Sequence, residues 1–109
     1  MIVEMDVQND NQKVVVMIRG EIDIYTAPKF KETLFQIIEN GAEEIIVNLS
    51  DVTYLDSAGL GVFVGTYKMI CSRKGKFELV GLSKRMQRLF DITGLADIIQ
   101  ITSDLKGEV

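Results

Sequence analysis

The chain has 109 residues, of which 47% are hydrophobic and 26% are charged, and its formal net charge is −4. This length suits one core, so we expect residues 1–109 to form a single domain. The negative charge argues against nucleic acid as a partner, and one cysteine without any histidine argues against zinc or a catalytic Cys-His pair. We expect no metal and no cofactor.

The amino-terminal segment is not typical of a secretion signal, because it reaches Glu4 without a basic start or a long apolar run. No stretch of the chain approaches the roughly 20 apolar residues that a membrane helix needs. We therefore expect a cytoplasmic protein with no membrane partner.

Two β-rich segments, residues 1–8 and 13–19, flank the turn-forming residues 9–12 and predict an antiparallel hairpin. The first segment is expected at a sheet edge. The unbroken apolar run from Val14 to Ile18 predicts a strand that is covered on both faces.

A helix is predicted after the loop of residues 21–25. Thr26 can cap it, Pro28 falls in its first turn, and Asn40-Gly41 ends it. Its apolar side chains recur at the spacing of one helical face, and they belong to Ala27, Phe30, Leu34, Ile37 and Ile38.

Strands are predicted at residues 45–49, 77–80 and 98–101, and helices at residues 58–73 and 84–93, the latter capped by Ser83 and ended by Gly94. The order is β-β-α-β-α-β-α-β. Because crossovers through helices imply parallel neighbours, we expect an α/β fold with one mixed β-sheet and helices packed on it. The core face of the middle helix is expected to carry Leu60, Phe63, Val64, Tyr67 and Ile70.

Ser57 stands where the second buried strand gives way to a helix. A hydroxyl at a helix start can accept a backbone N–H as an N-cap, and the same N–H groups can hold a phosphate. The spacing alone leaves both roles open. Gly59, Gly61 and Gly65 each weaken the helix by about 0.5–1 kcal/mol, which predicts close approach of its own sheet or of a partner.

The side of this helix away from its expected core face is partly apolar. It is expected either to be an exposed strip that docks a partner or to contact a neighbouring helix, and the residues concerned are Gly61, Val62, Gly65, Thr66 and Met69.

Three blocks of sequence carry a resemblance to a known family. They are residues 56–62 (Asp-Ser-Ala-Gly-Leu-Gly-Val), residues 20–23 (Gly-Glu-Ile-Asp) before Thr26-Ala27, and residues 88–95 (Arg-Leu-Phe-Asp-Ile-Thr-Gly-Leu). In this order and spacing they closely resemble bacterial anti-sigma factor antagonists of the STAS family. The resemblance extends from the first hairpin to about Ile101.

The resemblance implies partner switching. The unphosphorylated protein would capture an anti-sigma factor that is also a serine kinase, and phosphorylation of Ser57 would release it until a serine phosphatase restores the hydroxyl. Glu21 and Asp23 would lie near Ser57 and contact the kinase, although an Asp in such a loop is also typical of a turn or cap. The implied partner-binding residues are Glu21, Asp23, Thr26, Asp56, Ser57, Ala58, Gly59, Leu60, Gly61, Val62 and Gly65.

Two departures from the family pattern stand close to this site. Ala58 replaces a residue that often carries a hydroxyl, which leaves Ser57 as the one acceptor of the block. Ile24-Tyr25 stands where the family often has polar residues.

Two other functions are disfavoured by the sequence. An enzyme with Ser57 as nucleophile would have no histidine base and lacks the Gly two residues before Ser that marks a nucleophile elbow. A nucleotide-binding loop at Gly59-Leu60-Gly61 lacks a third glycine and the Gly-Lys-(Ser/Thr) of a P-loop. The sequence leaves a Ser-Lys pair open, but its other signals favour a binding protein, so we do not expect an enzyme. The alternative within the resemblance is a STAS accessory subunit of a lipid or anion transport system, or a stress-signalling scaffold.

Overall fold

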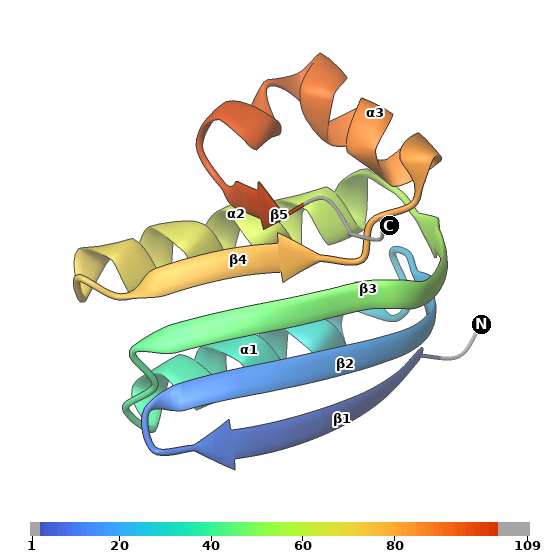
Figure 1. Cartoon of the computed structure of the whole chain (residues 1–109). Coiled ribbons are helices and arrows are strands. Elements are labelled where there is room, and N and C mark those ends of the chain that lie inside the picture. The colour runs from blue at the N-terminus through green and yellow to red at the C-terminus, as the bar shows by residue number, and fades with distance from the viewer. Residues whose placement is uncertain (1–2, 103–109) are drawn as a thin grey trace.

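The computed structural model describes residues 3–102, and it begins with the antiparallel hairpin of β1 (Val3–Asp10) and β2 (Lys13–Ile22) (Figure 1). Asp10 pairs with Lys13, so Asn11 and Gln12 form a two-residue turn, and Asn11 takes a positive φ of 59°. Asn tolerates this conformation better than most residues do, which is why the polar run can turn here. The hairpin is confirmed. Residues 1–2 of the predicted strand, and residues 103–109 of the predicted domain, lie outside the described residues.

The remaining elements alternate along the chain. They are α1 (Ala27–Glu39), β3 (Glu44–Leu55), α2 (Ser57–Ser72), β4 (Lys76–Val80), α3 (Lys84–Thr93), the short 3-10 helix η1 (Leu95–Asp97) and β5 (Gln100–Thr102). The sheet order is β1-β2-β3-β4-β5, and all neighbours after the hairpin are parallel. The predicted mixed sheet and element order are confirmed.

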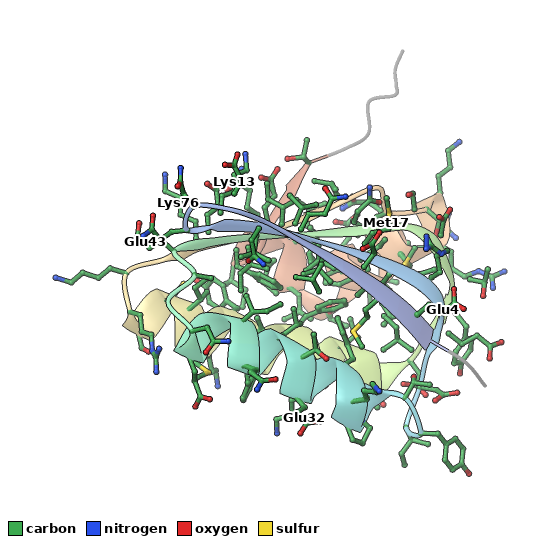
Figure 2. The ribbon with its side chains drawn as sticks, turned by 90° about the horizontal axis from the view of Figure 1, so that it is seen from below. Glu4, Lys13, Met17, Glu32, Glu43 and Lys76 are labelled. Carbon is green, nitrogen blue, oxygen red and sulfur yellow. The ribbon has the colours of Figure 1, made fainter. Side chains whose placement is uncertain are left out.

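Helices α1 and α2 lie against one face of the sheet, and α3 lies beside β5 (Figure 1). Along β2, Val14, Val16 and Ile18 are buried beneath these helices, whereas Val15 and Met17 between them are only half-buried. Figure 2 shows Met17 on the side of the sheet opposite α1. The prediction that both faces of this strand are covered is therefore wrong, because an unbroken apolar run does not distinguish one covered face from two.

Phe63 of α2 joins the helices and the sheet into one core. Its ring lies 5.4 Å from that of Phe30 on α1, 6.4 Å from that of Phe77 on β4 and 5.9 Å from that of Phe90 on α3, measured between centroids. Aromatic pairs at these separations add to the stabilisation that burial supplies.

The core face of α2 differs from the predicted one. Phe63 and Ile70 are buried as expected, but Leu60, Val64 and Tyr67 are half-buried at the side. The other buried residues of the helix are Gly59, Val62 and Thr66. Gly59 lets the start of the helix approach the sheet closely, and Phe63 and Ile70 bury the middle and the end of the helix.

Strand β3 continues well beyond the predicted residues 45–49. Its pairing with β2 shifts between Met17 and Arg19, which pair with Asn48 and Asp51, respectively. This irregularity puts Val52, and not Asp51, on the buried face after Leu49. The bulge therefore extends the strand to the start of α2 without burying a carboxylate.

Both ends of α3 and the carboxyl end of α1 follow the predicted signals. Ser83 Oγ accepts a hydrogen bond from Met86 N–H at 3.2 Å, and Gly94 ends α3 with φ of 80°. Asn40 is the C-cap of α1. The last strand begins at Gln100 and not at Ile98, because the chain is still turning at Ile98 and Ile99 after η1. Over residues 3–102, no helix has the length and apolar character needed to cross a membrane.

Candidate functional site

The carboxyl ends of β2 and β3 lie at the same edge of the sheet because the two strands are parallel. Ile22 pairs with Leu55, and Asp56 N–H then donates to the Ile22 carbonyl oxygen at 3.3 Å. This contact joins the loop that contains Asp23 to the segment that contains Ser57. The expectation that the two segments lie close together is confirmed for their backbones.

Ser57 is the first residue of α2, and it is exposed. Asp56 is the N-cap of this helix, with extended backbone (φ −118°, ψ −169°) and a carboxylate Oδ1 that accepts from Ala58 N–H at 2.9 Å. Of the two roles left open for Ser57, the N-cap role is therefore taken by Asp56: the helix begins one residue earlier than expected, and Asp is as good a cap as Ser. The Ser57 hydroxyl is left free of that task.

The loop before α1 is closed by its own side chains. The Thr26 hydroxyl donates to the Glu21 carbonyl oxygen at 2.8 Å and accepts from Asp23 N–H at 2.9 Å. Asp23 Oδ1 accepts from the N–H groups of Tyr25 and Thr26 at 2.9 and 3.0 Å. Thr26 holds the N-cap position of α1, but its side chain does not cap the helix as predicted, because both partners of its hydroxyl lie inside the loop.

Asp23 is only 3% exposed. Contrary to the expectation of a carboxylate offered to a partner, it acts as a turn residue, and its Oδ2 is buried without a hydrogen-bond partner. Burial raises the pKa of Asp23, but hydrogen bonds from Thr26 N–H, Tyr25 N–H and the Thr26 hydroxyl outweigh burial, so the pKa lies below its ordinary value. The side chain is therefore held ionised as a brace of the loop.

The three glycines of α2 differ in the space around them. A Cβ at Gly59 would lie 2.8 Å from Ile22 Cγ2 and closer still to Leu55 Cδ1, so Gly59 lets the start of the helix approach the sheet. A Cβ at Gly61 would meet nothing within 4 Å, whereas one at Gly65 would lie 3.4 Å from Phe35 Cζ on α1. Close approach to the protein's own sheet is thus confirmed for Gly59, and Gly61 is left open on the surface.

The predicted apolar strip of α2 is divided between the two interpretations. A Cβ at Gly65 would meet Phe35 of α1, so contact with a neighbouring helix is confirmed for Gly65, whereas Val62 and Thr66 are buried and not part of an exposed strip. Met69 is half-buried. Gly61 is exposed and remains available to a partner.

The implied partner-binding residues form a surface layer and a supporting layer. The exposed or half-buried residues are Glu21, Asp56, Ser57, Ala58, Leu60, Gly61 and Gly65. The buried residues that support them are Asp23, Thr26, Gly59 and Val62.

Three large exposed side chains at this edge were not predicted. Ile24 is 67% exposed, Tyr25 is 80% exposed and Tyr54, at the end of β3, is 48% exposed. The departure of Ile24-Tyr25 from the family pattern was visible in the sequence, but its exposure depends on how the loop folds. Apolar side chains gathered on a surface are typical of protein interfaces.

The arrangement presents a hydroxyl at the positive end of a 16-residue helix, beside the Asp56 carboxylate. A hydroxyl in this place is open to a modifying enzyme, and the helix dipole favours negative charge here. Across residues 3–102, no three His, Cys, Asp or Glu side chains are gathered as metal ligands would be.

Comparison with known proteins bears on this site. The pattern of the STAS domain family matches residues 3–107. The anti-sigma-B factor antagonist of Bacillus subtilis is 48% identical over 107 residues, covering 98% of this chain and 97% of that protein.

Solved structures share the fold. A crystal structure of a putative anti-sigma factor antagonist from Thermotoga maritima has a TM-score of 0.86 and 32% identity, and the match covers 93% of this chain and 86% of that chain. The Bacillus cell fate determinant SpoIIAA in the phosphorylated form has a TM-score of 0.76 at 22% identity, over 94% of this chain and 93% of that chain.

Proposed function

This chain belongs to the STAS domain family, and from the exposed hydroxyl of Ser57 we propose that it is an anti-sigma factor antagonist controlled by phosphorylation of that residue. In the unphosphorylated form it binds an anti-sigma factor and so frees a sigma factor for transcription. The protein acts by binding, not by catalysis, and it works in the cytoplasm, where sigma factors meet RNA polymerase.

The anti-sigma factor in this proposal is also a serine kinase. The Ser57 oxygen bonds to the terminal phosphorus of ATP held by the kinase, ADP departs with the bridging oxygen, and the hydroxyl proton passes to a base of the kinase. A serine phosphatase reverses the change by transferring the phosphoryl group to water. No atom of the present chain is needed as a catalyst, which agrees with the absence of histidine.

The capping geometry supports this choice of acceptor. Because Asp56 caps α2, phosphorylation of Ser57 removes no hydrogen bond that the helix start depends on. The added charge also lies at the end of the helix that favours anions, so the domain stays folded when modified. The fold of the phosphorylated SpoIIAA structure is of the same kind.

Phosphate then opposes the partner by electrostatics and solvation. It brings about −1.5 to −2 charge to a position next to the Asp56 carboxylate, and it must be stripped of water if a protein surface covers it. A tenfold loss of affinity requires only about 1.4 kcal/mol, which one desolvated phosphate readily supplies. Release therefore needs no rearrangement of the sheet or helices.

Binding of the anti-sigma factor, measured by calorimetry, tests the proposal. Ser57→Asp is expected to weaken binding at least about tenfold, whereas Ser57→Ala keeps it. Ser72→Asp is the matched control, because it places the same charge at an exposed position at the other end of α2. Equal affinity of Ser57→Asp and the wild type would contradict the proposal.

Intact mass after incubation with the kinase and ATP tests the acceptor itself. We expect one phosphate on the wild-type protein and none on Ser57→Ala. A phosphate retained by the variant would move the switch to another residue.

A further inference from the structure

A groove opens between the starts of α1 and α2, directly beside Ser57. Its volume is about 520 Å³. Residues that line it include Ile24, Pro28 and Lys31 on one side and Ala58, Gly61 and Val62 on the other. Ala58 follows Ser57 in the chain, so a partner that senses a phosphate on Ser57 also stands over this groove.

The groove is open where Gly61 lines its α2 side. Gly61 has no side chain, and a Cβ built there would touch nothing within 4 Å, so the fold itself does not require glycine at this position. Glycine in a helix nevertheless lowers its stability by about 0.5–1 kcal/mol relative to alanine. This unexplained weakness of α2 is accounted for if another molecule occupies the space.

Ile24 forms an apolar wall of the groove and is held out in solvent by its loop. It is 67% exposed, while Asp23 and Thr26 on either side of the Ile24-Tyr25 pair are buried and hydrogen-bonded to the loop. The hydrogen bonds between Asp23 and Thr26 therefore fix the backbone from which Ile24 projects. An apolar side chain that is preorganised in this way loses little freedom when it is covered.

The groove carries positive charge, whereas the surface around Ser57 carries negative charge from Glu21 and Asp56. Among the residues of 3–102 that line it, Lys31 alone is charged, and its Nζ lies 5.3 Å from the centroid of the Phe35 ring. Exposed Lys29 stands on the same helix. Glu21 and Asp56, by contrast, give the neighbouring surface a negative charge. A complementary partner carries an apolar side chain and a carboxylate over the groove, and positive charge near Glu21 and Asp56.

We propose that this groove receives an apolar side chain of the anti-sigma factor, flanked by a carboxylate that pairs with Lys31. The inference rests on the proposed function and adds to it the residues that select the partner: Ile24, Lys31 and the open space over Gly61. Ser57 decides whether the partner stays bound, and the groove decides which partner fits.

Filling the groove tests the proposal most directly. Gly61→Leu is expected to weaken binding of the unphosphorylated protein to the anti-sigma factor at least about tenfold, because the new side chain occupies the partner's place. Ser72→Leu adds the same side chain to an exposed position at the other end of the helix and should leave the affinity unchanged. Thermal unfolding of both variants shows whether each remains folded.

Removing the apolar wall gives an independent readout that does not depend on filling the groove. Ile24→Ser is expected to weaken binding about tenfold, since a largely exposed isoleucine would no longer be buried by the partner. Ile92→Ser on α3 is the matched control, because Ile92 is 75% exposed. Lys31→Glu is expected to weaken binding more at low salt than at high salt.

The outcomes separate the two proposals. If Gly61→Leu and Ile24→Ser bind like the wild type while Ser57→Asp does not bind, the groove proposal is overturned and the phosphorylation switch stands. If the wild type fails to bind an anti-sigma factor, the proposed function falls and the groove proposal falls with it. If light scattering finds a wild-type dimer that Gly61→Leu abolishes, the occupant is a second copy of this chain, and the assignment to the anti-sigma factor is overturned.

Discussion

Helices α1 and α2 begin side by side at one edge of the sheet, and each start combines an aspartate with a hydroxyl residue. At the start of α1, Thr26 is 7% exposed and its hydroxyl is hydrogen-bonded to Glu21 and Asp23. At the start of α2, Asp56 supplies the cap and Ser57 stays exposed. The same pair of residue types therefore makes a rigid loop at one start and a modifiable surface at the other.

The difference arises from which side chain satisfies the backbone. In the first loop both the Asp23 carboxylate and the Thr26 hydroxyl accept hydrogen bonds from backbone N–H groups of the loop. In the second, the Asp56 carboxylate caps the helix through Ala58 N–H, and the hydroxyl can change its chemical state without loss of a structural contact. The proposed phosphorylation of Ser57, next to a capping aspartate, would therefore leave the contacts that hold the fold unchanged.

The largest expected effect concerns how the start of α2 is held against the sheet. Gly59→Ala is expected to destabilise the protein by about 2 kcal/mol, because the added Cβ is forced against Ile22 and Leu55. Gly61→Ala is the matched control two residues along the helix. Because the site is open, this substitution is expected to raise the free energy of unfolding by about 0.5–1 kcal/mol. Urea unfolding measures both. A stabilised Gly59→Ala would mean that the helix start is not pinned by close packing.

A smaller effect compares the two hydroxyls directly. Thr26→Val keeps the shape of the side chain but leaves Asp23 N–H and the Glu21 carbonyl oxygen unpaired, so it should cost about 1.5 kcal/mol of unfolding free energy. Ser57→Ala should change that free energy by less than about 0.5 kcal/mol, since its hydroxyl is exposed. If chemical denaturation shows equal losses of unfolding free energy for the two variants, the Thr26 hydroxyl is no more important for the fold than the Ser57 hydroxyl.

Features encoded by short stretches of sequence were predictable. The order of strands and helices follows from the spacing of apolar residues, and the ends of α3 follow from Ser83 and Gly94, which act on their immediate neighbours. The Ser57 segment was also found, because its block of small residues after a strand is unusual and resembles a known family.

Features that depend on pairing across the sheet were not predictable. The start of α2 is set by where β3 ends, and this depends on the bulge and on the Asp56 contact with Ile22. Two adjacent residues that both cap well, Asp56 and Ser57, therefore could not be ranked locally. The burial of Asp23 and the exposure of Ile24 likewise depend on a loop whose hydrogen bonds form only when it closes.

The smallest expected effect is the pH dependence that the Asp23 brace gives to the first helix start. Because hydrogen bonds from Thr26 and Tyr25 lower the folded-state pKa of Asp23, its ionised form stabilises the fold fully above the unfolded-state pKa, about 3.9. This contribution is lost as the pH falls below about 4 and through the folded-state pKa. Asp23→Asn keeps an Oδ1 acceptor for both N–H groups but removes the titration, so the advantage of the wild type over this variant should shrink between pH 5 and 3. Urea unfolding measures the free energy of unfolding of both proteins across that range. If the two free energies change in parallel with pH, the shape of the side chain, and not its ionised carboxylate, holds the loop from which Ile24 projects.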